Sequence, residues 1–152
     1  MTSISEFRRI LVDTSAWIAL MNRKDRLHER AAAFHREYGT SVRRVTTWGI
    51  VSETYTWLRY HIGHEAGQHW LQTQASLQST GFLEVIYPTP DLDSGVRAIL
   101  SRYADQDLSY VDAFSIHVIR SNKDLDAAFA FDHHFALAGV PVIPGGGQEK
   151  VK

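Results

Sequence analysis

The sequence contains no cysteine. This absence excludes disulfide bonds, thiolate zinc sites, iron–sulfur clusters and catalysis by a cysteine nucleophile. No apolar run approaches the ~18–20 residues that span a membrane. Residues 1–10 carry charged side chains instead of the apolar core of a signal peptide. We therefore expect a cytoplasmic protein with no membrane segment.

Neither sign of charge dominates the chain, because 16 basic and 17 acidic residues give a net charge of −1. This balance argues against a generally basic protein that coats nucleic acid. The charge is nevertheless uneven, since residues 1–59 have a net charge of +4 and residues 60–152 a net charge of −5. The first part could meet a phosphate backbone while the second holds cations.

The length of 152 residues suits one domain, which usually has ~100–200 residues. Short apolar runs predict strands at residues 9–12, 42–46, 82–87, 127–131 and 140–143. Segments of helical periodicity predict helices at residues 14–21, 27–38, 48–59, 64–78, 91–103 and 109–120. The alternation favours an α/β protein with a mostly parallel sheet. We expect a single domain over residues 1–144, followed by a flexible glycine-rich tail, residues 145–152.

Short polar side chains precede several of these helices. Ser, Thr, Asp and Asn are the preferred N-cap residues. The expected caps are Thr14 or Ser15, Thr47, Asp91 or Asp93, and Ser109.

Four acids stand where a carboxylate is unusual. Asp13 and Asp132 each end an apolar run, and sites in parallel sheets form beyond the carboxyl ends of strands. Glu53 and Asp112 lie on helical faces whose other members are apolar. A buried carboxylate costs free energy by itself, and the cost falls when several share a cation. Mg²⁺ and Mn²⁺ favour such oxygen ligands, so the acids predict a divalent metal site.

Each acid also has a purely structural interpretation. Asp13 and Asp132 could be helix N-caps after a strand. Ser109 and Asp112 have the spacing of a capping box. Glu53 could pair with an arginine. These alternatives stay open at the level of sequence.

The order of these acids carries a family resemblance. The motifs are Val12-Asp13-Thr14-Ser15, Ser52-Glu53, Asp107-x-Ser109-x-x-Asp112-Ala113 and Ala130-Phe131-Asp132-His133-His134-Phe135. As a set they resemble PIN-domain ribonucleases, most closely the VapC-type toxins of bacterial and archaeal toxin–antitoxin modules. The resemblance runs from about residue 8 to residue 144.

The resemblance implies a three-layer α/β/α fold with a parallel sheet of four or five strands. It also implies a role for each acid. Asp13, Glu53, Asp112 and Asp132 correspond to the catalytic, metal-binding acids of the family. Supporting positions fall on Thr14, Ser15, Asp107 and Ser109, with Asp105 as an alternative to Asp107.

The implied activity is RNA cleavage that depends on Mg²⁺ or Mn²⁺ and leaves a 3′-hydroxyl and a 5′-phosphate. The implied partners are an RNA substrate, an antitoxin protein and a second copy in a homodimer. A catalytically silent module that binds RNA or protein is the alternative function. The first loop would lie near the Asp13 end of the sheet, so its basic residues are candidate RNA contacts: Arg23, Lys24 and Arg26.

Aromatic and histidine side chains are less informative. The four tryptophans fall among apolar neighbours, which favours core or interface positions over base stacking. The family resemblance implies that Trp17, Leu20 and Met21 could contribute to a homodimer or to an antitoxin groove. His133 and His134 follow Asp132 directly, and one could reach the phosphate or a metal-bound water. Adjacent side chains seldom point the same way, however, and this favours a structural role for the pair.

Overall fold

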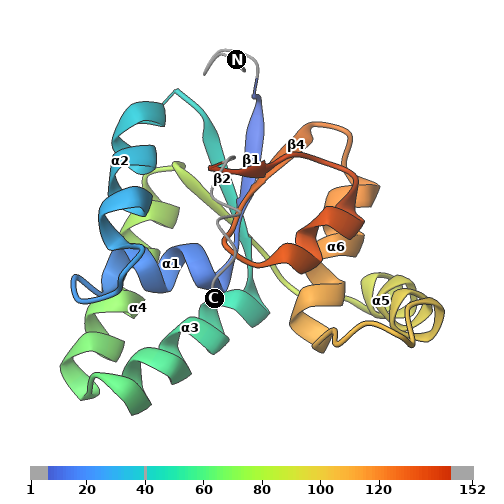
Figure 1. Cartoon of the computed structure of the whole chain (residues 1–152), viewed down its shortest axis with the longest axis horizontal. Helices are drawn as coiled ribbons and strands as arrows, with labels where there is room; N and C mark the ends of the chain where they lie inside the picture. The colour runs from blue at the N-terminus through green and yellow to red at the C-terminus, as the bar shows by residue number, and fades with distance from the viewer. Residues whose placement is uncertain (1–6, 40, 145–152) are drawn as a thin grey trace.

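Five short strands form one sheet, in which every neighbouring pair is parallel and the order is β3-β2-β1-β4-β5 (Figure 1). The computed structural model describes residues 7–39 and 41–144. The strands are β1 (Arg9–Val12), β2 (Arg43–Thr47), β3 (Leu83–Ile86), β4 (Leu125–Phe129) and β5 (Val142–Ile143). The parallel sheet of the predicted α/β fold is confirmed. The predicted tail, residues 145–152, lies outside the described residues.

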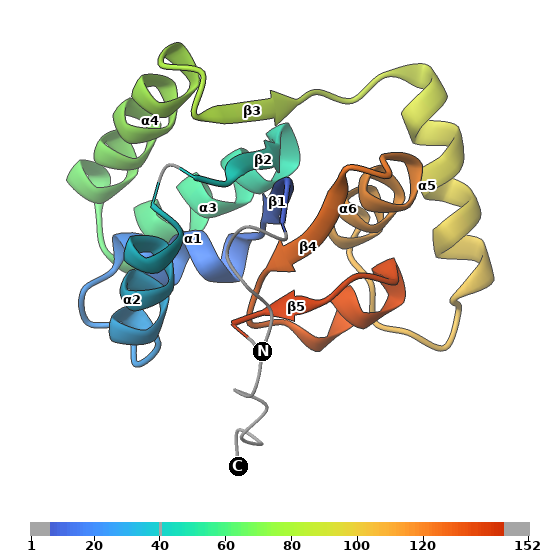
Figure 2. The same cartoon turned by 90° about the horizontal axis from the view of Figure 1, so that it is seen from above.

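Helices cover both faces of the sheet and form the outer two of three layers (Figure 2). One side holds α1 (Thr14–Met21), α2 (His28–Tyr38), α3 (Trp48–His61) and α4 (His64–Ser79). The other holds α5 (Pro90–Arg102) and α6 (Tyr110–Ser121), with the 3-10 helix η2 (His133–Ala138) beside α6. Among the described residues, none of these helices has the length and apolar character needed to cross a membrane.

β1 is the central strand because its side chains are apolar on both faces. Ile10, Leu11 and Val12 are buried. Leu11 lies opposite Val45 of β2 on one side and Ala128 of β4 on the other. A strand buried on both faces is typical of a parallel sheet between two helical layers.

Two indole rings join the first helical layer to the sheet. Trp17 and Trp70 are buried, and their ring centroids are 4.9 Å apart. The Trp17 indole donates to Thr46 Oγ1, and that hydroxyl donates to the Val12 carbonyl at 3.0 Å. Trp17 is therefore a core residue, and its predicted contribution to a partner surface is wrong.

Two of the expected caps are confirmed and two are wrong. Thr47 accepts from the backbone N–H of Ile50, and Ser109 forms a capping box with Asp112. α1 is capped by Asp13 instead of Thr14 or Ser15. α5 begins at Pro90 with Thr89 as its cap instead of Asp91 or Asp93. Proline is favourable at the first helical position, because its missing N–H would be unpaired there.

The fourth strand lies two residues earlier in the chain than its apolar run, residues 127–131, predicts. β4 ends at Phe129, two residues before the expected end at residue 131. The N–H of Ala130 still bonds to the carbonyl of Ile143, but the N–H of Phe131 donates to Ser15 Oγ. Asp132 thus follows a short connection and begins η2, a 3-10 helix that the sequence did not predict.

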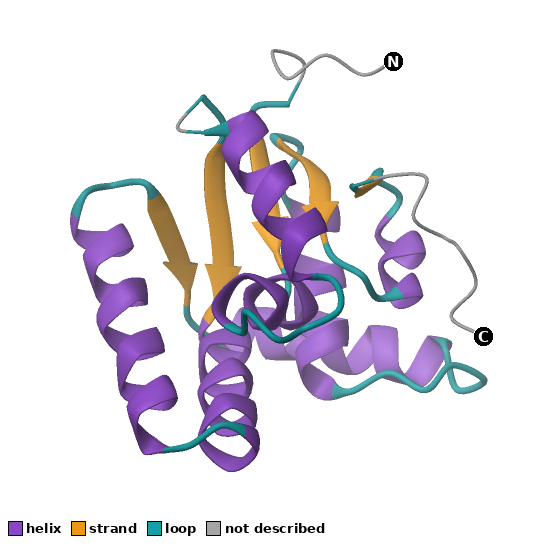
Figure 3. Cartoon of the chain, turned by 60° about the vertical axis from the view of Figure 1, so that its left-hand side comes forward, coloured by secondary structure: helices purple, strands orange, loops and turns teal. Residues whose placement is uncertain are grey.

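All strands point to one edge of the sheet, where α1 and α3 begin (Figure 3). α6 leads into β4 and runs in the opposite direction, so its first turn lies at the same edge. The chain order also reverses beside β1, since β2 and β3 lie on one side of it and β4 and β5 on the other. Ligand sites of open α/β sheets form at such reversals.

Candidate functional site

The four predicted acids reach the carboxyl edge of the sheet from four different elements. Asp13 links β1 to α1, and Glu53 lies in the second turn of α3. Asp112 lies in the first turn of α6, and Asp132 precedes η2. Because the sheet is parallel, residues more than 100 positions apart in the sequence arrive at one place.

Asp13 is the most deeply buried of the four, with 3% of its surface exposed. Its Oδ2 accepts from the backbone N–H of Ser15 at 3.3 Å and from Ser15 Oγ at 2.9 Å. Burial away from water disfavours the charged form and raises the pKa of Asp13 to about 7. Its bonds to Ser15 and Thr14 oppose this shift, and the negative charge of Asp112 adds to it.

Glu53 is half-buried on α3 and has no arginine among the groups that shift its pKa. Burial raises that pKa, the nearby Thr14 hydroxyl lowers it, and the charges of Asp112 and Asp132 raise it. Thr14 Oγ1 is itself buried and meets no described residue with hydrogen-bond geometry. The alternative in which Glu53 pairs with an arginine is therefore not what the described residues show, since its electrostatic neighbours are other acids.

The capping box at the start of α6 holds Asp112 in place. The backbone N–H of Asp112 donates to Ser109 Oγ at 3.0 Å, and Asp112 Oδ2 accepts from the Ser109 N–H at 3.1 Å. The predicted supporting residue Ser109 thus acts on Asp112 directly. Asp105 and Asp107 are exposed, and within the described residues neither forms a hydrogen bond with any of the four acids.

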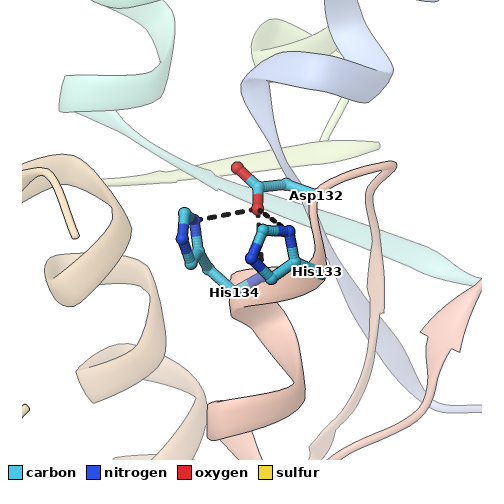
Figure 4. Close-up of side chains that lie close together, drawn as sticks. All are labelled: Asp132, His133 and His134. Carbon is cyan, nitrogen blue, oxygen red and sulfur yellow. Dashed lines mark hydrogen bonds and ion pairs between the residues drawn. The ribbon is translucent and has the colours of Figure 1, made fainter. Parts of the chain in front are cut away.

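The Asp132 carboxylate lies beside two neighbouring histidine rings, those of His133 and His134 (Figure 4). Its Oδ1 accepts from the backbone N–H of His134 at 2.9 Å, which makes Asp132 the N-cap of η2. His134 Nδ1 lies 2.9 Å from the same oxygen and 3.9 Å from Asp112 Oδ2. His133 Nδ1 lies 3.8 Å from Asp132 Oδ1, on a side chain that is 84% exposed.

The structure therefore brings the four acids close enough to influence one another's charge, but it does not arrange all four as a compact set of metal ligands. The pairs that repel each other are Asp13 with Asp112, Glu53 with Asp112, and Glu53 with Asp132. Within the described ranges, only Asp132, His133 and His134 offer three ligand atoms that all lie within 4.8 Å of one another. Sequence reasoning favoured a structural role for both histidines, whereas His134 turns toward the acids.

The structural and functional interpretations of these acids are compatible. Asp13 and Asp132 are N-caps, and Asp112 completes a capping box, as the alternatives predicted. A carboxylate has about four lone-pair positions, so one capping bond leaves room for another partner. Carboxylate oxygens that repel each other in a half-buried site form a donor set suited to a hard divalent cation.

An open groove of about 490 Å³ has Glu53 in its wall. Aromatic side chains of α3 line it, including Trp48, Trp57 and Tyr60. Trp48 is 50% exposed and Tyr60 is 81% exposed. Of the two positions predicted for the tryptophans, core or interface, Trp48 therefore does not occupy the core. Hydrophobic periodicity alone could not find this surface, since α3 is apolar on its buried side as well.

The first loop follows α1, and its basic residues are exposed: Arg23, Lys24 and Arg26. Their contact with RNA stays a prediction.

Comparison with known proteins agrees with this architecture. The 23S rRNA-specific endonuclease VapC20 of Mycobacterium tuberculosis strains CDC 1551 and H37Rv is 33% identical over 130 residues. Those residues are 86% of this chain and 94% of that protein. The crystal structure of M. tuberculosis VapC20, described as a sarcin-ricin loop cleaving toxin, superposes with a TM-score of 0.75. That match has 32% identity and covers 86% of this chain and 95% of the other.

The family model of the PIN domain matches residues 10–140, nearly the whole described chain. The matched segment contains most of β1, all of β2, β3, β4 and η2, and all four acids, and it ends just before β5. The predicted resemblance to PIN-domain ribonucleases of the VapC type is thereby confirmed, and the chain belongs to the PIN domain family.

Proposed function

We propose that this protein is an endoribonuclease that hydrolyses RNA phosphodiesters with the help of Mg²⁺ or Mn²⁺, and that it is the toxin of a toxin–antitoxin pair. The observation that carries the proposal is the cluster of four acids at the carboxyl edge of the sheet: Asp13, Glu53, Asp112 and Asp132. The charge of Asp112 raises the pKa of Asp13, and the charges of Asp112 and Asp132 raise the pKa of Glu53. The two VapC20 relatives, named as rRNA endonucleases, support RNA as the substrate.

The four acids fit a divalent cation on the chemistry of their donor atoms. Their oxygens are hard ligands, and Asp13 is buried without a cationic side chain among the groups that shift its pKa. When bound, such a cation supplies a Lewis acid that activates water and neutralises charge on a phosphodiester. Mg²⁺ and Mn²⁺ both suit the set.

The side chains of this protein have distinct proposed roles around the cation. Asp13, Glu53, Asp112 and Asp132 bind it, and the capping bonds of Ser15 and Ser109 orient the carboxylates of Asp13 and Asp112. The Thr14 hydroxyl favours the charged form of Glu53. Asp107 is exposed on the loop before α6, and its supporting role stays a prediction.

The surroundings of the acids suit single-stranded RNA. Aromatic rings in the groove beside Glu53 offer stacking surfaces that every base can use. The basic loop after α1 offers charges for the phosphate backbone: Arg23, Lys24 and Arg26. We include the cytoplasm, an antitoxin and a homodimer in the proposal because VapC20 is described as a toxin that cleaves the sarcin-ricin loop.

Cleavage of RNA by purified protein tests the proposal. A mixed RNA pool is incubated with Mg²⁺, with Mn²⁺ and with EDTA, and product ends are identified as 5′-phosphate or 5′-hydroxyl. We expect cleavage with either metal, none with EDTA, and a loss of at least about 100-fold in Asp112→Asn, since even outer partners of a metal site contribute about 10- to 100-fold.

Glu65→Gln is the matched control, because Glu65 is an exposed acid at the start of α4, away from the cluster. It should cleave as fast as the parent. Equal cleavage by the folded Asp112→Asn protein, or cleavage that persists in EDTA, would refute the metal site. Binding of RNA and of the cation by the parent protein, without cleavage of the RNA, would favour the catalytically silent alternative.

A further inference from the structure

The ring of His134 presents a buried nitrogen to the acid cluster. Its Nδ1 is shielded from solvent and forms no hydrogen bond with any described residue. The atom nevertheless lies 2.9 Å from Asp132 Oδ1, a contact whose geometry does not suit a hydrogen bond. A buried polar atom left without a partner costs about 1–3 kcal/mol. This position therefore needs a further partner.

The backbone holds this nitrogen where it is. The N–H of His134 donates to Asp132 Oδ1, which fixes the first turn of η2. η2 packs against α6, and Asp112 Oδ2 of α6 lies 3.9 Å from His134 Nδ1. Only 15% of the His134 side chain is exposed. The ring is thus positioned between two acids by the main chain and by packing.

A cation between these atoms would supply the missing partner. Adjacent ligands of an octahedral ion with bonds of ~2.1 Å lie about 3 Å apart. The distance of 2.9 Å between His134 Nδ1 and Asp132 Oδ1 matches that ligand edge. A neutral imidazole nitrogen and a carboxylate oxygen both carry lone pairs, so they tolerate this closeness best when both face a positive ion.

We propose that His134 Nδ1 is a ligand of the divalent cation, beside Asp132 and Asp112, and that this nitrogen donor gives the site a preference for Mn²⁺ over Mg²⁺. Imidazole suits borderline transition metals, whereas Mg²⁺ takes oxygen ligands almost alone. The inference rests on the acid site of the proposed function and adds a fifth protein ligand to it.

An ion pair is the competing explanation of the same contact. If His134 served as a cation that neutralises Asp132, its removal would leave more negative charge at the site, and divalent cations would bind more tightly. If His134 is a ligand, its removal weakens binding. The two explanations predict effects of opposite sign.

His133 provides a matched control. It is the neighbouring histidine, and its Nδ1 lies 3.8 Å from the same Asp132 oxygen, but its side chain is 84% exposed. The exposed nitrogens of His133 already form hydrogen bonds with water, so exchanging water for a cation gains little free energy. His133 should therefore contribute little to the affinity for the cation.

The test is the binding of Mn²⁺ and of Mg²⁺, each alone, to the purified full chain by calorimetry at one fixed pH. We expect His134→Ala to weaken Mn²⁺ binding about tenfold or more, with a smaller loss for Mg²⁺, whereas His133→Ala stays within about twofold. His134→Gln is the second variant, in which an amide oxygen replaces the nitrogen. It should keep Mg²⁺ binding and lose the preference for Mn²⁺.

Pulsed electron paramagnetic resonance of bound Mn²⁺ supplies a readout that a structural role would not move. A directly coordinated ¹⁴N nucleus should appear in the parent and in His133→Ala, and disappear in His134→Ala and His134→Gln. Absence of ¹⁴N coupling in the parent, or Mn²⁺ binding in His134→Ala as tight as in the parent, would overturn the inference. Failure of the parent to bind either ion, or undiminished binding by Asp112→Asn, would instead overturn the metal site of the proposed function.

Discussion

Replacing Asp13 by asparagine removes a buried charge and keeps the shape of the side chain. Burial is the main cause that raises the pKa of Asp13 to about 7, and the charge of Asp112 adds to it. An unfolded chain has an aspartate pKa of about 3.9. The folded protein therefore binds this proton more tightly than the unfolded chain does. The stability that results is complete below about pH 4 and is lost as the pH rises through 7.

The size of this effect follows from the difference in pKa. One pKa unit corresponds to 1.36 kcal/mol, so a difference of about three units corresponds to about 4 kcal/mol. In the absence of divalent cations, the parent protein should lose about that much unfolding free energy at Asp13 between pH 4 and pH 8. Asparagine has no charge to bury, and its side-chain oxygen can still accept the bonds from Ser15. We expect Asp13→Asn to be more stable than the parent at pH 8, by up to about 4 kcal/mol, and similar to it at pH 4.5.

Urea denaturation in EDTA at pH 4.5 and pH 8, at one ionic strength, measures this difference. Asp91→Asn changes an exposed acid in the first turn of α5 and should give no gain that depends on pH. Addition of Mg²⁺ at pH 8 should stabilise the parent and leave Asp13→Asn unchanged, because the variant lacks a proposed ligand. A variant that is less stable than the parent at pH 8, or whose gain is equal at both pH values, would refute the reasoning from burial.

Three further variants, two with a single substitution and one with three, test other parts of the structure. Ser15→Ala removes bonds to Asp13 and to the N–H of Phe131, and should lower the unfolding free energy by about 1–3 kcal/mol in urea, with no loss as the contrary result. Gly95→Ala places a methyl group 2.1 Å from the His117 ring and should destabilise by about 1–3 kcal/mol, whereas alanine in an unobstructed helix would stabilise. Neutral glutamines at all three basic positions of the first loop should reduce the slope of log K against log salt for single-stranded RNA by about 2, and an unchanged slope would exclude the loop from the RNA interface. Those positions are Arg23, Lys24 and Arg26.

Local sequence signals predicted most of the elements because local chemistry determines them. β1 has the predicted bounds, since a buried apolar run is followed at once by Asp13. α3 begins where Thr47 predicted. The end of β4 depends instead on a partner distant in sequence, because Ser15 Oγ takes the N–H of Phe131. No periodicity within residues 127–131 contains that information.

The membership of the acid cluster was predictable, and its geometry was not. Parallel strands bring their carboxyl ends to one edge, and this predicts that Asp13 and Asp132 lie together. Glu53 and Asp112 joined the prediction through their apolar helical faces and the family resemblance. The direction of His134 depends on the 3-10 turn that Asp132 starts. Adjacent side chains point to opposite faces in a strand, whereas in a 3-10 helix they are separated by a smaller angle. The sequence did not predict the 3-10 helix, so it gave no reason to distinguish His134 from His133.

The capping bonds explain how a cluster of like charges persists in a folded protein. Asp13, Asp112 and Asp132 each lie at the N-terminus of a helix, where unpaired N–H groups and the helix dipole favour negative charge. Each cap fixes a carboxylate in one direction and offsets part of its repulsion from the others. The same capping bonds thus stabilise the fold and fix the three carboxylates at one edge of the sheet. A substitution at any of the three changes both properties, so unfolding free energy and cation affinity have to be measured together to separate them.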